Sequence, residues 1–223
     1  MNAEPRAAAA RRGPDLARPD AASVHITHWH APGRDAARAL LDEVSDRWAA
    51  AVWPDGLLSF HAYLDTAGDT VLTYVQSART TAHHDLVRTL RGPAAAAAVS
   101  YRLHTSVVLD ATGTPPGAVV VATFDVDGAD AQERIIESVA RAVTDAPAEQ
   151  REGMLSAHFH ASTDGSRVLN YAEWTSDEAH LAFLEGAARA ATLRATGATA
   201  GVRPIGFRRF HLHHGITPER SDT

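Results

Sequence analysis

The sequence contains neither cysteine nor lysine, because its Cys count is zero and all 21 of its basic residues are Arg. Without Cys there is no disulfide framework, thiolate nucleophile, iron–sulfur cluster or Cys-ligated zinc. Without Lys there is no Schiff base and no P-loop lysine. The conspicuous enrichment is 13 His in 223 residues. These side chains supply groups that titrate near neutral pH.

Basic residues are too few for a nucleic-acid-binding protein. Asp and Glu number 27 against 21 Arg, which gives a formal net charge of -6, so no excess of positive charge is available to neutralise phosphates. No apolar run approaches the roughly 20 residues of a membrane span. The N-terminus has no apolar segment behind Arg11 and Arg12 that would make an export signal. We therefore expect a soluble cytoplasmic protein with no nucleic-acid or membrane partner.

The chain divides into two similar halves with an apolar content of 45%, enough to form a core. Residues 1–21 have almost no large apolar side chains and predict a flexible tail. The predicted units are residues 22–110 and 118–216, joined by a linker at 111–117 that is rich in Pro and Gly and followed by a tail at 217–223.

An internal repeat supports this division. Gly56-Leu57-Leu58-Ser59-Phe60-His61 recurs 97 residues later as Gly153-Met154-Leu155-Ser156-Ala157-His158. The same register continues through the next turn, strand and helix start, where Ala82-His83 matches Ala179-His180. Upstream, Leu40 and Leu41 match Ile135 and Ile136 with a shift of 95. An alignment of this length with one small shift indicates tandem duplication.

Each half shows the order strand, helix, strand, strand, helix, strand. Hydrophobic periodicity and turn residues place these elements. The predicted ranges are Val24 to Trp29, Arg34 to Ala51, Leu58 to Leu64, Val71 to Val75, Thr80 to Leu90 and Tyr101 to Leu109, then Val119 to Val126, Ala129 to Thr144, Met154 to His160, Arg167 to Trp174, Asp177 to Arg194 and Gly206 to His213. This order predicts an α+β fold of two tandem ferredoxin-like units packed sheet to sheet as an intramolecular pseudo-dimer.

The second half carries a candidate polar cluster. Side chains alternate along a strand, so Asn170 and Trp174 share one face. On the preceding strand, Met154, Ser156, His158 and His160 are expected to share a face, and hairpin pairing is expected to bring His160 close to that pair. An amide, an indole N–H and an imidazole on an apolar surface suit a flat oxygenated aromatic ligand.

At these residues the sequence resembles the antibiotic biosynthesis monooxygenase family. The resemblance rests on Val168-Leu169-Asn170-Tyr171-Ala172-Glu173-Trp174, preceded by Gly153-Met154-Leu155-Ser156-Ala157. It implies ferredoxin-like units and a monooxygenase that oxidises a polycyclic aromatic polyketide with O2 in antibiotic biosynthesis. The outcome would be a quinone from an anthrone or hydroquinone, or oxidative ring cleavage. Many members use no cofactor, and some tandem relatives are thought to use reduced flavin.

The resemblance also assigns site residues. The family's Asn and Trp fall on Asn170 and Trp174, a pocket His falls on His160, and an Arg of the last helix falls near Arg194. His180 stands where some anthrone oxygenases have a Tyr. We expect His160 or His180 to transfer protons and Asn170 with Trp174 to stabilise the oxyanion. Substrate-binding positions are expected at His158, Arg194, Phe183 and Tyr63.

The first half departs from the motif. When the two halves are aligned, Thr73 and Ser77 occupy the Asn and Trp positions of the motif, and Tyr63 aligns with His160. We therefore expect one working pocket, in the second half, with the first half as its permanent partner. The chain would be a monomeric pseudo-dimer or would associate further as a homodimer.

Two other functions remain open from the sequence. The first is a non-catalytic protein that binds aromatic ligands or assists a cyclase. The second is a haem-degrading oxygenase, which is disfavoured because Leu184 stands where the haem-ligating His is expected. No metal site is expected, because the His groups at 25, 28 and 30 and at 211, 213 and 214 lack accompanying carboxylate spacing.

Overall fold

A computed structural model describes residues 13–218. The outer parts of both predicted tails, residues 1–12 and 219–223, lie outside the described residues. The expectation of a flexible tail is wrong for its inner part, because Leu16 is only 6% exposed and packs into a hydrophobic core. The Gln76 side chain also donates a hydrogen bond to the Asp15 carbonyl oxygen at 2.7 Å. One buried Leu thus anchors a segment whose composition otherwise suggests disorder.

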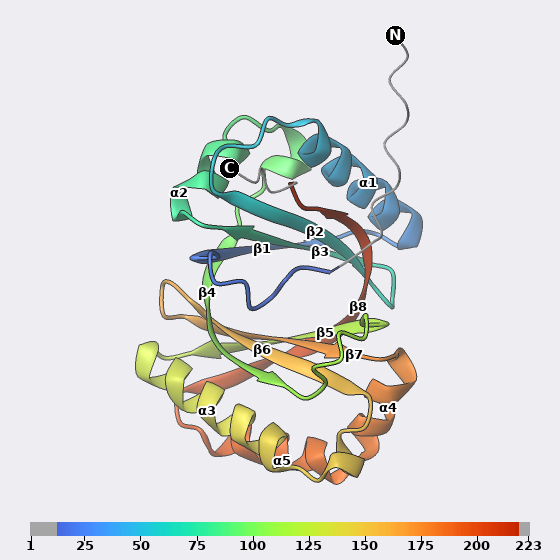
Figure 1. Cartoon of the computed structure of the whole chain (residues 1–223), viewed down its shortest axis with the longest axis vertical. Coiled ribbons are helices and arrows are strands. Elements are labelled where there is room, and N and C mark those ends of the chain that lie inside the picture. The colour runs from blue at the N-terminus through green and yellow to red at the C-terminus, as the bar shows by residue number, and fades with distance from the viewer. Residues whose placement is uncertain (1–12, 219–223) are drawn as a thin grey trace.

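The order of elements agrees with the predicted repeat (Figure 1). The first half contains β1 (Ser23–His30), α1 (Arg34–Ala50), β2 (Leu57–Asp65), β3 (Thr70–Ser77), α2 (Thr80–Val87), the short 3-10 helix η1 (Gly92–Ala95) and β4 (Val99–Val108). The second half contains β5 (Ala118–Val126), α3 (Ala129–Asp145), the 3-10 helix η2 (Ala148–Gln150), β6 (Met154–Ser162), β7 (Arg167–Trp174), α4 (Asp177–Glu185), α5 (Ala187–Ala198) and β8 (Val202–Ile216).

The predicted last helix is divided in two. Gly186 adopts an extended backbone with φ -90° and ψ 168°, so it ends α4 and precedes α5. Glycine is a poor helix interior residue, because ordering it costs about 1 kcal/mol more than ordering Ala. The break redirects the chain after Glu185 and changes which later side chains face the sheet.

The strands form one antiparallel barrel in the order β1-β3-β2-β8-β5-β7-β6-β4, closed by β4 on β1. The fourth strand of each half crosses to the other half. β4 pairs with β6, matching Leu103 to His160, and the end of β8 pairs with β2, matching Tyr63 to Leu212. The fold is thus α+β with eight antiparallel strands, consistent with two fused ferredoxin-like units. The predicted bounds of the two units stay predictions. So does the expectation that the two halves pack against each other as an intramolecular pseudo-dimer.

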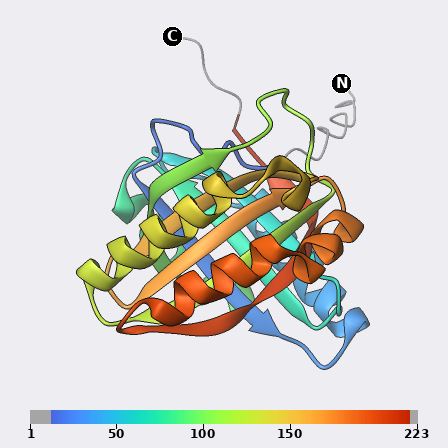
Figure 2. The same cartoon turned by 90° about the horizontal axis from the view of Figure 1, so that it is seen from below.

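Three cores follow from this arrangement. Inward side chains from both halves, including Tyr63, Tyr74 and Tyr171, fill the barrel. Outward side chains of the first half pack under α1 and α2, and those of the second half under α3 and α4. Figure 2 shows α3 and α5 lying across the outer face of the second-half sheet. No helix among the described residues is long and apolar enough to cross a membrane.

Candidate functional site

The candidate site is a cavity of about 320 Å³ between the outer face of the second-half sheet and the helices α3, α4 and α5. Its volume lies at the lower end of the usual range for small-molecule sites. The walls are mainly apolar, with a few polar groups. The lining residues come from seven elements and include Val120, Val143, Met154, Asn170, Trp174, His180, Phe183, Arg189, Thr192, Leu193, Thr196 and Phe207.

Strand β7 contributes two of the predicted residues as expected. Asn170 and Trp174 alternate with Tyr171 and Glu173, and both line the cavity. Asn170 lies opposite Ala122 of β5 and Phe159 of β6, so its amide is held in the middle of the sheet. Trp174 is only 2% exposed at the strand end. The two-residue repeat of a strand therefore predicted this pair.

Three polar atoms on the cavity wall lack a protein partner. The Asn170 Oδ1, Trp174 Nε1 and His180 Nδ1 atoms are buried and make no hydrogen bond. A buried polar group without a partner costs about 1–3 kcal/mol, and native proteins satisfy most of them. Because all three belong to residues that line one cavity, an oxygenated ligand is the natural partner for this surface.

His180 is held by α4, which begins where the Ser176 hydroxyl accepts a hydrogen bond from the Ala179 backbone N–H at 3.2 Å. The His180 ring contacts Trp174 edge-on at 5.1 Å and Phe207 at 5.4 Å between centroids. Burial, reinforced by the charge of Arg209, lowers the pKa of His180 to about 4. The imidazole is therefore neutral and able to accept a proton at neutral pH.

Arg189, rather than Arg194, supplies the cation of the cavity. Arg189 lines the cavity and donates a hydrogen bond to the Leu184 carbonyl oxygen at 3.3 Å. Arg194 is exposed on α5 and is not among the lining residues. The expectation for Arg194 is corrected because the break at Gly186 changes the helical phase. Charge alone could not distinguish these two residues in the sequence.

The placement predicted for His160 is wrong. A bulge between Met154 and Ser156 shifts the register of β6, so Met154 lies opposite Trp174 while His160 lies opposite Leu169. His160 therefore points into the barrel, where its Nε2 contacts the Tyr74 hydroxyl at 3.0 Å. Burial lowers the pKa of His160 to about 3. It lies on the opposite face of the sheet from Asn170.

Two predicted substrate-binding residues also lie inside the barrel. The His158 side chain lies on the same face of β6 as His160. The Tyr63 hydroxyl lies 2.8 Å from the Tyr171 hydroxyl. Both line a second cavity at the barrel mouth and neither lines the cavity under the helices. Phe183 is the predicted substrate-binding residue that does line it, with its ring 5.1 Å from Trp174.

Aromatic rings fill the equivalent position in the first half. His25 stands where the second half has Val120, as the pairing of β1 with β3 and of β5 with β7 confirms. The His25 ring stacks on His83 at 4.0 Å, and Trp48 stacks on Phe60 at 4.6 Å. Trp48 and Phe60 replace the smaller Val143 and Ala157. These substitutions give a physical reason for the predicted degeneracy of this half.

The same first-half group brings three imidazoles together. Ligand atoms of His25, His83 and His84 lie within 4.8 Å of one another. The geometry is poor for a metal, because the stacked rings of His25 and His83 are 6° from parallel and in-plane lone pairs of parallel rings do not converge. Both His25 nitrogens also contact hydroxyls, of Ser77 and Ser100, at 3.1 Å. The cluster suits packing better than coordination.

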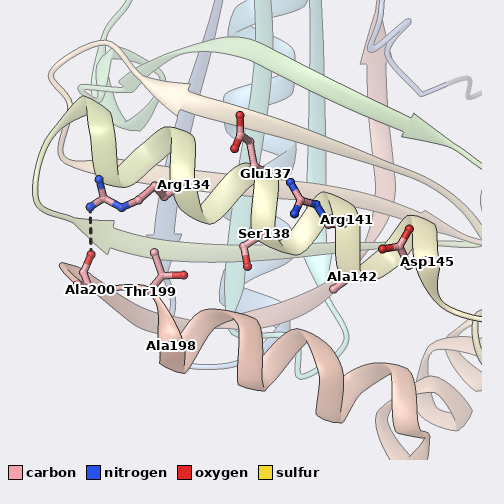
Figure 3. A pocket seen from close by; sticks show the side chains of 9 residues that line it. All are labelled: Arg134, Glu137, Ser138, Arg141, Ala142, Asp145, Ala198, Thr199 and Ala200. Atoms are coloured by element: carbon pink, nitrogen blue, oxygen red, sulfur yellow. Dashed lines mark hydrogen bonds between the residues drawn. The ribbon is translucent and has the colours of Figure 1, made fainter.

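A separate hollow lies on the outside of the second half, between α3 and the end of α5 (Figure 3). Arg134 donates a hydrogen bond to the Ala200 carbonyl oxygen at 3.4 Å at one end of it. Glu137, Arg141 and Asp145 give mixed charge on exposed positions of the same wall. None of the described polar side chains that line this hollow is buried.

Several lining residues gave no signal in the sequence. Phe207 and Leu193 line the cavity while remaining 44% and 55% exposed, so the cavity opens between β8 and α5. Thr192 and Thr196 reach it from α5, and the Thr196 hydroxyl donates to the Thr192 carbonyl oxygen at 2.9 Å. Their contribution depends on how α5 crosses the sheet, which local sequence does not specify.

Together, these features define an α+β protein, consistent with two fused ferredoxin-like units, with a mainly apolar cavity between sheet and helices. The profile of the family described as antibiotic biosynthesis monooxygenase matches residues 118–195. A comparison with curated proteins found no match.

Solved structures add three comparisons. An anthrone oxidase-like protein is 15% identical with a TM-score of 0.69 and covers 89% of this chain and 94% of its own. A monooxygenase-like protein from Listeria innocua is 11% identical with a TM-score of 0.51, covering 90% of this chain and 96% of its own. A Streptomyces coelicolor monooxygenase, solved with the ligand nanaomycin D, is 35% identical over 48% of this chain and 92% of its own, with a TM-score of 0.35. The chain belongs to the antibiotic biosynthesis monooxygenase family, which supports a monooxygenase-type function.

Proposed function

We propose that the protein is a monooxygenase that oxidises a polycyclic aromatic polyketide, which binds in the second-half cavity and is converted there to its anion. The observation that carries this proposal is the set of three buried polar atoms without partners on Asn170, Trp174 and His180. They surround an apolar space of about 320 Å³ whose lining contains one Arg and no carboxylate among the described residues. A phenolate or enolate oxygen complements the Trp174 N–H and the charge of Arg189, while the Asn170 Oδ1 and the neutral His180 Nδ1 can accept hydrogen bonds from substrate hydroxyls.

The reaction needs little from the protein beyond converting the substrate to its anion and keeping water out of the site. Triplet O2 reacts slowly with closed-shell molecules, but an electron-rich carbanion can transfer one electron to it and then recombine to a peroxide. For an anthrone, loss of water from the hydroperoxide gives the quinone. One oxygen atom enters the product and the other leaves in water, so no further reductant is required.

His180 is the proposed proton acceptor. Its neutral imidazole, whose pKa is lowered to about 4 by burial, accepts a proton from the substrate and returns it to the departing peroxide oxygen. A base this weak is effective only toward a substrate whose anion is strongly delocalised, which favours anthrones and phenols. A positioned acid–base group of this kind contributes about 10²- to 10⁴-fold to the rate.

The Trp174 N–H is the proposed donor to the developing oxyanion. Asn170 fixes the substrate's orientation through its amide, and Arg189 adds positive charge at the α5 wall. Donors held in a water-poor site stabilise transition-state charge without reorganising. Because Trp174 and Asn170 lie on one rigid strand, their spacing is set before the substrate binds.

Reduced flavin was the cofactor alternative. The cavity under the helices, of about 320 Å³, lies at the lower end of the range for small-molecule sites, which favours the substrate alone over substrate and flavin together. Cofactor independence remains part of the proposal.

The test is O2 uptake by the metal-stripped protein with a simple anthrone or a naphthohydroquinone, with and without reduced flavin. We expect uptake with quinone formation in the absence of flavin and its loss in the Asn170→Ala/Trp174→Phe variant. Tight ligand binding without O2 uptake would instead identify a binding or cyclase-accessory protein. Uptake only with flavin would favour ring cleavage, and a Soret band with haemin would favour haem degradation.

A further inference from the structure

The barrel mouth contains a second cavity that the proposed reaction does not use. Its volume is about 930 Å³, and its walls combine β2, β5, β6, β7, β8 and the end of β4 with the linker and the segment 13–17. Apolar side chains such as Val119, Leu155 and Phe210 make up much of the lining. It lies on the inner face of the same sheet, since Tyr171 and Glu173 line it while Ala172 and Trp174 line the other cavity.

The charge of this cavity is opposite to that of the first. Among the described residues that line it, Asp15, Asp110 and Glu173 are carboxylates and none is Arg. An anionic ligand would meet repulsion here, whereas the cavity under the helices offers Arg189 and no carboxylate. The barrel mouth therefore favours uncharged ligands over phenolates and phosphates.

Two buried hydroxyls provide a hydrogen-bond donor. Tyr63 and Tyr171 are each 1% exposed, and their hydroxyl oxygens lie 2.8 Å apart. One hydroxyl donates to the other, so the hydrogen of the accepting hydroxyl has no acceptor among the described residues. Burial raises the pKa of both side chains, which keeps both hydroxyls protonated. A ligand carbonyl would supply the missing acceptor.

A chain of hydrogen bonds holds Glu173, the group that can accept a hydrogen bond from a ligand in this cavity. The Ser156 hydroxyl donates to the Glu173 Oε2 at 2.7 Å, so Ser156 accepts from the His158 Nε2–H at 3.0 Å. The His158 Nδ1 then accepts from the Ser106 hydroxyl at 2.8 Å. This chain holds Glu173 through one oxygen and leaves the other to accept a hydrogen bond from a ligand hydroxyl.

We propose that the barrel mouth is a second binding site, specific for an uncharged aromatic molecule that carries both a carbonyl and a hydroxyl group, such as a hydroxyquinone. The Tyr63–Tyr171 pair donates to the carbonyl, Glu173 accepts from the hydroxyl, and the apolar walls cover the rings. The site discriminates against anions through its carboxylates. It does not depend on the proposed oxygenase activity.

Two isomeric probes test this selectivity at pH 7. 5-Hydroxy-1,4-naphthoquinone is uncharged at this pH, whereas 2-hydroxy-1,4-naphthoquinone is an anion because its hydroxyl is a vinylogous acid. Binding is measured by calorimetry with the full chain, which has no Cys or Lys to form adducts. We expect the uncharged isomer to bind the barrel mouth and the anion to bind only the cavity that contains Arg189.

Matched variants assign each binding event to a cavity. Tyr63→Phe/Tyr171→Phe removes both partners of one hydrogen bond, a change that is nearly neutral for stability, and should weaken the uncharged probe about tenfold. Trp174→Phe should leave that binding unchanged. If the double variant binds the uncharged probe with unchanged affinity, the proposal is wrong.

Glu173→Gln gives an independent check. Gln can still accept from Ser156, but it removes a negative charge, so the anionic isomer should gain a binding event at the barrel mouth. No gain for the anion in this variant would overturn the charge argument. O2 uptake, measured separately on the same proteins, distinguishes failure of this site from failure of the proposed oxygenase.

Discussion

The Tyr74 hydroxyl lies 3.0 Å from the His160 Nε2, and this contact joins β3 of the first half to β6 of the second inside the barrel. The His160 Nδ1 contacts the His158 carbonyl oxygen at 3.0 Å. A carbonyl can only accept, so Nδ1 carries the hydrogen and Nε2 accepts from Tyr74. Both nitrogens of His160 are therefore engaged in structural hydrogen bonds.

Tyr74→Phe should destabilise the protein without affecting the reaction. The variant leaves the buried Nε2 of His160 without a donor, which costs about 1–3 kcal/mol of unfolding free energy. Chemical denaturation measures this loss, and O2 uptake with an anthrone should stay at the wild-type rate. A large loss of uptake in a folded variant would return His160 to the catalytic machinery.

His180→Gln should reduce O2 uptake about 10²- to 10⁴-fold, because the proposed proton acceptor is removed from the cavity. His83→Gln is the matched control, since His83 occupies the equivalent position of the first half and stacks on His25. The control should keep its rate. Equal rate losses in the two variants would contradict the assignment of one working pocket.

Trp174→Phe should separate activity from stability. The substitution removes the buried Nε1–H, which has no protein partner, while keeping an aromatic ring against His180. We expect the unfolding free energy to be preserved or raised, because an unsatisfied donor is lost. The rate should fall about 10²- to 10³-fold, as for other oxyanion donors. Steady-state kinetics and denaturation on one preparation test both parts.

Stability should decrease as the pH is lowered from about 6.5 to 4. Burial lowers the pKa of His25, His158 and His180 to about 4, and that of His83 and His160 to about 3. The unfolded chain binds these protons near pH 6.5, so it binds more protons than the native state throughout this window. The melting temperature should be flat above about pH 7 and fall below it. A flat profile down to pH 4 would show that these histidines are not buried in the native state.

Gly153→Ala should disturb the start of α4 and with it the position of His180. Gly153 has φ +77°, and a Cβ there would lie 2.5 Å from the Ala179 Cβ. Gly165→Ala is the control, because it shares φ +77° but its nearest neighbour would be 3.7 Å away. Both variants should lose about 1 kcal/mol or more through backbone strain, and only Gly153→Ala should also lower the rate of O2 uptake.

The sequence was most informative where local rules apply. The recurrence of Gly56–His61 at Gly153–His158 predicted two similar halves, and the two-residue period of a strand predicted that Asn170 and Trp174 share a face. The match of His83 with His180 followed from the same register. These inferences need only the periodicity of helices and strands.

The tertiary structure decided which of these residues meet. The bulge between Met154 and Ser156 turned His160 into the barrel, and the break at Gly186 left Arg189, not Arg194, in the cavity. The exchange of β4 and β8 between the halves was likewise absent from the predicted order. A one-residue bulge reverses every later side chain of a strand, and a long-range strand pairing depends on contacts that local sequence does not encode. The sequence by itself therefore determined the elements and the candidate pair, while packing decided the composition of the site.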